Sequence, residues 1–93
     1  MTGKPDFLIP PHVYFTEVDG QMVLLNLDNE QYFGLDEVGT NMITRLTEQS
    51  SDTALTDLIE EYEVDPDVLR RDMLDLVDKL LTAGLLIRSE PPN

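Results

Sequence analysis

The stretch VDGQMVLLNLDNEQYFGLDEVG, residues 18–39, decides the fold, because it holds two turn signals and the start of a helix. Asp19-Gly20 separates two runs rich in β-branched and aromatic residues, 12–18 and 21–27, and an Asp-Gly pair favours the type I′ turn of a hairpin. The second run is apolar at both odd and even positions. It therefore predicts a central strand that is covered on both faces.

A second turn begins at Asp28, and QYFGL, residues 31–35, follows it. The three runs together predict an antiparallel meander whose third strand lies at an edge. Tyr32 and Phe33 are adjacent in this strand, so their rings point to opposite faces.

Three helices are predicted after the meander. Asp36 is suited to cap the first, over residues 36–48, and Asp52 or Thr53 to cap the second. The third starts with Asp65 as N-cap and Pro66 at its first position, and it runs over 66–83 to Gly84, a typical C′ residue. Residues 85–87 then form a short extended tail that packs back.

The predicted fold class is α+β, a three-stranded antiparallel meander followed by three helices in a winged helix-turn-helix-like arrangement. One domain over residues 12–88 is expected, after a flexible N-terminal arm over 1–11 and before a disordered tail over 89–93. A chain of 93 residues is the size of one domain with one core.

Composition argues against several classes of function. Six basic and nineteen acidic residues give a net charge of −13, which disfavours nucleic acid and anionic membranes as partners. The charge serves solubility, or it steers a basic or neutral partner. No apolar run is long enough to span a membrane and the first residues lack a secretion signal, so we expect a cytoplasmic protein.

Enzymatic groups are scarce. There are no cysteines, and the single histidine, His12, lacks a partner nucleophile or second histidine. Asp72, Asp75 and Asp78 drift across the polar side of the third helix as a solvated face does. We therefore expect no catalysis, no metal and no cofactor. The third helix is also net negative, which is unsuited to DNA recognition.

The third strand and the third helix together suggest a peptide groove. QYFGL carries no Lys, Pro or charge, the devices that normally block an edge, so an extended peptide could pair with it. The apolar stripe of the helix covers an arc of about 160°, wider than the ~100° that a core contact needs. Its surplus edge holds Leu74, Leu81 and Val77 with Arg70 beside them, and Arg70 could bind an acidic group. The alternative is that the aromatics and the whole stripe are buried in the core.

The runs VDGQMVLLNLDNEQYFGLDEVGTNMITRL and LTDLIEEYEVDPDVLRRDMLDLVDKLLTAGLL resemble the PqqD-like proteins, the recognition elements for ribosomally made, post-translationally modified peptides. The resemblance covers about residues 12–87. The shared features are a Leu-Leu run (Leu24-Leu25), a turn (28–31), an aromatic strand (32–35) that enters a helix with a small residue (Gly39), a Tyr-x-Val-Asp step (62–65) and a final Gly-Leu-Leu (84–86). Asn26-Leu27 stands where PqqD itself often has Pro-Glu, which favours the stand-alone branch of lasso-peptide biosynthesis.

This resemblance implies that the leader segment of a precursor peptide binds as an added antiparallel strand on the third strand, against the third helix. It implies delivery to a transglutaminase-like leader peptidase, with a cyclase as a further candidate partner. The implied binding residues are Gln31, Tyr32, Phe33, Gly34 and Leu35 on the strand, and Leu69, Arg70, Met73, Leu74 and Val77 on the helix. Which of Tyr32 and Phe33 faces the groove stays open. The alternatives are a winged-helix transcription regulator and a non-catalytic subunit of another peptide-modifying enzyme, such as a PQQ-type radical enzyme.

Overall fold

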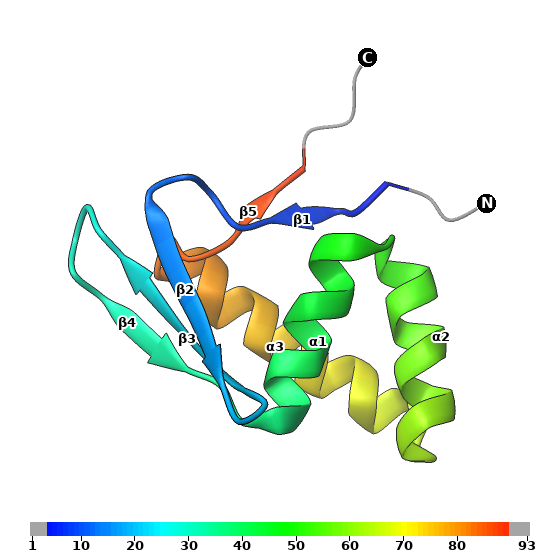
Figure 1. Cartoon of the computed structure of the whole chain (residues 1–93). Coiled ribbons are helices and arrows are strands. Elements are labelled where there is room, and N and C mark those ends of the chain that lie inside the picture. The colour runs from blue at the N-terminus through cyan, green and yellow to red at the C-terminus, as the bar shows by residue number, and fades with distance from the viewer. Residues whose placement is uncertain (1–3, 90–93) are drawn as a thin grey trace.

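The computed structural model describes residues 4–89 and confirms the predicted α+β fold, a three-stranded antiparallel sheet with three helices packed beside it (Figure 1). Two very short strands near the chain ends form a second, separate ladder. The elements in chain order are β1 (Phe7–Leu8), β2 (Val13–Val18), β3 (Gln21–Asn26), β4 (Tyr32–Gly34), α1 (Glu37–Glu48), α2 (Ser51–Tyr62), α3 (Pro66–Thr82) and β5 (Ile87–Arg88).

The meander has the order β2-β3-β4, which leaves β4 at an edge as predicted. Asp19 and Gly20 have φ values of 53° and 79°, so both central residues of the hairpin turn adopt the positive φ of a type I′ turn. The prediction that β3 is covered on both faces is wrong. Met22, Leu24 and Asn26 are buried beneath the helices, whereas Val23 on the other face is exposed, because no further layer covers that side.

The helix boundaries follow side-chain caps. Asp36 Oδ1 accepts from the backbone N–H of Gly39 at 2.7 Å, and Asp65 Oδ1 accepts from the N–H of Asp67 at 2.8 Å. The cap of α2 differs from the prediction of Asp52 or Thr53. Ser50 occupies that position, and its hydroxyl accepts from the Thr53 N–H at 3.3 Å, because a serine three residues before a free N–H can satisfy it as well as an aspartate does.

The segment before β2 is also more structured than predicted. Within the described part of the expected arm over residues 1–11, Phe7 and Leu8 pair antiparallel with Arg88 and Ile87. Phe7 is buried in the core and the guanidinium of Arg88 lies 5.5 Å from the centre of its ring. β5 is the pairing partner of this segment. Because β5 lies at the other end of the chain, the local sequence does not reveal the pairing. The expected tail over 89–93 lies outside the described residues apart from Ser89, whose N–H donates to the carbonyl of Asp6.

The core lies between the inner face of the sheet and the three helices. Seven large side chains have almost no exposed surface, and burial of each contributes about 1.5–3 kcal/mol. They come from β3, every helix and the segment between α3 and β5, and they are Leu24, Ile43, Leu46, Leu58, Leu80, Leu85 and Leu86. The predicted tail after Gly84 therefore packs back onto the domain, since its first two residues are part of this core.

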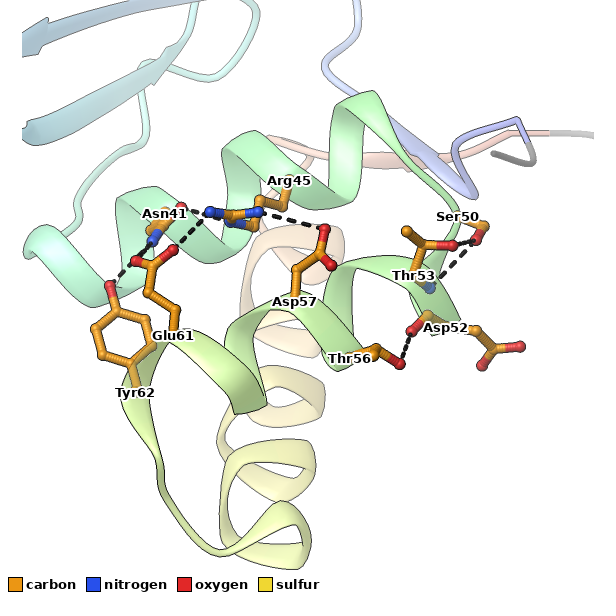
Figure 2. Close-up of polar contacts among 9 residues, drawn as sticks. All are labelled: Asn41, Arg45, Ser50, Asp52, Thr53, Thr56, Asp57, Glu61 and Tyr62. Atoms are coloured by element: carbon orange, nitrogen blue, oxygen red, sulfur yellow. Dashed lines mark hydrogen bonds and ion pairs between the residues drawn. The ribbon is translucent and has the colours of Figure 1, made fainter. Parts of the chain in front are cut away.

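A polar network joins α1 to α2 (Figure 2). Arg45 pairs with Glu61 at 2.6 Å and with Asp57 at 3.4 Å, and these are the ion pairs found among residues 4–89. Asn41 accepts from Arg45 Nε and donates to Glu61 and to the Tyr62 hydroxyl. One of the few basic side chains is thus committed to holding two helices together. Within the same residues, no helix is long and apolar enough to cross a membrane.

Candidate peptide-binding groove

The free edge of β4 presents main-chain groups at two residues. The N–H of Asn26 donates to the carbonyl of Gln31 at 2.8 Å, and the N–H of Leu35 donates to the carbonyl of Met22 at 2.7 Å. Hydrogen-bonded pairs alternate in an antiparallel ladder, so Phe33 also directs its backbone groups toward β3. Tyr32 and Gly34 therefore direct their N–H and C=O groups away from β3, as a template for another strand.

Two buried polar side chains fix β4 in relation to the helices. Asn26 is buried at the end of β3, and its amide nitrogen donates to the carbonyls of Ala83 and Gly84 at 3.2 Å each. Thr40 in α1 accepts from the N–H of Met22 at 2.8 Å and donates to the carbonyl of Leu35 at 3.4 Å. The sheet is thereby tied to the end of α3 and to the start of α1, so the spacing between β4 and α3 is set by internal bonds.

Glycine is required at the α3 end of this tie. Gly84 has a φ of 73°, and a Cβ at this position would lie 2.7 Å from the amide nitrogen of Asn26. The His12 ring also lies 3.3 Å from the Gly84 carbonyl, so the single histidine has a structural contact here.

Two hollows lie end to end between β4 and α3. The first, of about 630 Å³, is lined by Glu30, Gln31, Tyr32, Phe33, Asp78, Lys79, Thr82 and Ala83. The second, of about 280 Å³, is lined by Phe33, Gly34, Leu35, Asp36, Val38, Gly39, Met42, Asp72, Leu76 and Lys79. Phe33 and Lys79 are the residues common to both, so they stand at the junction. We call the two hollows together the β4–α3 groove.

The five strand residues of the predicted site all line this groove, and the two rings differ in role. Phe33 is half-buried and packs against the core on the helix side. Tyr32 is 75% exposed and belongs to the outer face of the sheet, where the register aligns it with Leu25 and Tyr14. Phe33 is therefore the ring directed toward α3, although residue Tyr32 also borders the first hollow.

The helix residues of the predicted site are placed elsewhere. Leu69, Met73 and Val77 are buried in the core and border neither hollow. Arg70 is exposed but borders neither hollow. Leu74 is 58% exposed, as the wide stripe predicted, yet it borders a different hollow, formed with Phe7 and Arg88 beside β1 and β5.

The groove instead uses the opposite flank of α3, with Asp72, Leu76, Lys79 and Ala83. These residues follow one another at helical spacing and lie on the other side of the buried stripe from Leu74. A helical wheel identifies both flanks of a stripe but does not say which one borders a given strand. That choice comes from the tertiary arrangement, which sequence reasoning missed. Leu76 and Ala83 were the available signals, because both are apolar and adjoin the stripe on this side.

The groove offers surface for binding rather than a set of reactive groups. Its walls combine apolar side chains with the main-chain edge of β4, and its acidic and basic residues are Glu30, Asp36, Asp72, Asp78 and Lys79. Among residues 4–89 there is no group of three or more His, Asp or Glu side chains placed to hold a metal ion. An extended peptide is the ligand that such a surface fits, because it can pair with β4 and place alternate side chains between β4 and α3.

The chain belongs to the PqqD family, since the family model described as coenzyme PQQ synthesis protein D matches residues 21–86. It is similar to two solved proteins, each in complex with a leader peptide. One is TbiB1 in complex with the TbiA(beta) leader peptide, with 30% identity, a TM-score of 0.80, and coverage of 90% of this chain and 99% of that one. The other is lasso peptide synthetase B1 complexed with the leader peptide, with 28% identity, a TM-score of 0.79, and coverage of 88% and 98%. A comparison with the curated proteins gave no match.

Proposed function

We propose that this protein binds the leader segment of a ribosomally made precursor peptide in lasso-peptide biosynthesis, as a β-strand added to the free edge of β4. The observation that carries the proposal is the pair of outward-directed residues, Tyr32 and Gly34, beside a groove formed with α3. The two similar structures support it, because both were solved with a leader peptide and match nearly the whole chain.

In this proposal the protein is a binding module that delivers the leader to an enzyme and performs no chemistry itself. The enzyme we propose is a leader peptidase of transglutaminase type, with a cyclase as a further candidate. The family model takes its name from PQQ synthesis, whereas one of the two similar structures is a lasso peptide synthetase B1 and both hold a leader peptide. The lasso assignment is favoured because those structures resemble this chain over almost its full length. Location in the cytoplasm stays a prediction from the sequence.

The winged-helix arrangement alone would also suggest a DNA-binding regulator, and charge disfavours that function. Four aspartates on α3 outnumber its three basic residues, and the groove is lined by four carboxylates and one lysine. DNA affinity depends on neutralising phosphates and falls steeply with salt. Main-chain pairing with a peptide depends on salt far less.

The proposal is tested by titrating the protein with the synthetic leader peptide of the precursor encoded beside it, using fluorescence anisotropy. Gly34→Pro removes an outward N–H without removing a bond to β3, so we expect the dissociation constant to rise about tenfold or more. Gly34→Ala is the matched control, because it keeps the N–H and its added Cβ meets nothing within 4 Å. We expect it to bind as the wild type does.

Equal affinities of the proline and alanine variants, both folded by circular dichroism, would contradict strand addition at β4. A wild-type protein that does not bind the leader would contradict the proposed function as a whole.

A further inference from the structure

The β4–α3 groove has a charge pattern of its own. Its first hollow is bordered by Glu30 and Asp78, its second by Asp36 and Asp72, and the only cationic residue in either lining is Lys79. Because Lys79 borders both hollows, it lies between Glu30, which precedes β4, and Asp36, which follows it, while Asp72 and Asp78 are on its own helix. The pattern along the groove is therefore negative, positive, negative.

Lys79 is available to a ligand. It is exposed, and its ammonium group lies in a salt bridge with none of the carboxylates of residues 4–89, since the ion pairs within that range all belong to Arg45. This holds even though Asp72, Asp75 and Asp78 lie on the same helix. The position opposite Lys79 is Phe33, an uncharged ring that cannot neutralise it.

A peptide strand laid along β4 would cover Lys79 and partly remove it from water. Covering an ammonium group without a partner carries a desolvation penalty, and a carboxylate on the peptide would offset it. At the two ends of the groove, where the protein's own groups are carboxylates, the preferred charge on the peptide is reversed. Carboxylates there would lie beside like charges, whereas basic or neutral residues would be accepted.

We infer that Lys79 selects leader segments that carry an Asp or Glu where the bound strand crosses the Phe33–Lys79 junction and have neutral or basic residues on both sides of it. This inference rests on the proposed function and adds the substrate preference of the same site. An antiparallel strand would place the N-terminal side of that leader segment beside Asp36 and Asp72, and its C-terminal side beside Glu30 and Asp78.

The test is a charge exchange between protein and peptide. Each Asp or Glu of the neighbouring precursor's leader is changed in turn to Lys, and every peptide is titrated against wild type, Lys79→Glu and Arg71→Glu. Arg71 is the matched control, since it is an exposed cation on the same helix that borders neither hollow. Its substitution changes the net charge of the protein by the same amount.

We expect one leader substitution to weaken binding to wild type about tenfold, as loss of one partly desolvated charge pair would. The same peptide should bind Lys79→Glu with a dissociation constant within about twofold of that of the unmodified leader and wild type. Arg71→Glu should give no such recovery.

The inference is overturned if the unmodified leader binds wild type and binds Gly34→Pro more weakly, but no exchange at Lys79 restores binding of any leader variant. It is also overturned if a leader peptide without Asp or Glu has the same dissociation constant for the Lys79→Gln variant and for the wild-type protein. Such a peptide leaves the Lys79 ammonium group without a partner, so it should bind the wild type more weakly than the variant. Neither result would touch the proposed function, which fails only if the leader does not bind along β4 at all.

Discussion

Leu74 and Leu76 are identical side chains two positions apart on α3, and their surroundings differ. Leu76 packs beside the core and borders the second hollow of the groove with Phe33. Leu74 is mostly exposed on the opposite flank, toward β1 and β5. Since two positions on a helix are separated by about 200°, Leu74 and Leu76 lie on different flanks of α3.

This pair provides a matched test of which flank binds. We expect Leu76→Ala to raise the dissociation constant for the leader about threefold to tenfold, because part of the apolar wall is removed. Leu74→Ala should leave it unchanged. The measurement is anisotropy titration of both variants with the same labelled leader peptide. If Leu74→Ala weakened binding and Leu76→Ala did not, the leader would lie on the flank of α3 that faces β1.

At the scale of elements, local sequence determines most of the fold. The Asp19-Gly20 turn, the caps at Asp36 and Asp65, and Gly84 after α3 all act through bonds within a few residues, so their effects could be predicted. The edge position of β4 followed from the order of the turns. The turn and the two caps depend on chain neighbours alone, whereas Gly84 is also required by its close contact with Asn26.

The features that were missed depend on contacts between distant segments. The pairing of β1 with β5 joins residues about eighty positions apart, and the tie from Asn26 to Gly84 joins the sheet to a helix end. The flank of α3 that borders β4 is fixed by such contacts too. The strand side of the β4–α3 groove could therefore be predicted from sequence, whereas its helix side could not.

Asp6, the residue before β1, stabilises the start of α2. Asp6 Oδ2 accepts from the N–H of Ser51 at 3.0 Å, and hydrogen bonds from the backbone and side chain of Ser51 hold the pKa of Asp6 below its ordinary value of 3.8. A carboxyl whose folded-state pKa is lowered contributes stability above its unfolded pKa. That contribution is lost as the pH falls through the folded pKa.

We therefore expect Asp6→Ala to be less stable than wild type near neutral pH, with the difference shrinking as the pH falls below about 4. Urea unfolding at a series of pH values measures this. Glu60→Ala, which removes an exposed carboxylate from α2, controls for the general effect of net charge. A difference for Asp6→Ala that is constant between pH 7 and the acid limit would contradict the role of the ionised carboxylate.

For the molecule as a whole, the net charge of −13 and the open edge of β4 belong together. An unblocked edge strand can pair with the same strand of another copy, and like charge on both copies opposes that encounter. The groove itself is lined by four carboxylates and Lys79, so the same charge opposes a peptide that is acidic on both sides of Lys79 and does not oppose one that is neutral or basic there. The charge that opposes self-association is thus also the basis of the proposed ligand preference.

The central claim, that a leader peptide adds a strand to β4, is tested most directly by amide hydrogen exchange with and without the leader. The N–H groups of Tyr32 and Gly34 point away from β3, so we expect their exchange to slow markedly when the leader is bound. The N–H of Phe33 already lies in the ladder with β3 and should change little. Unchanged exchange at both Tyr32 and Gly34 in the leader-saturated protein would contradict the claim.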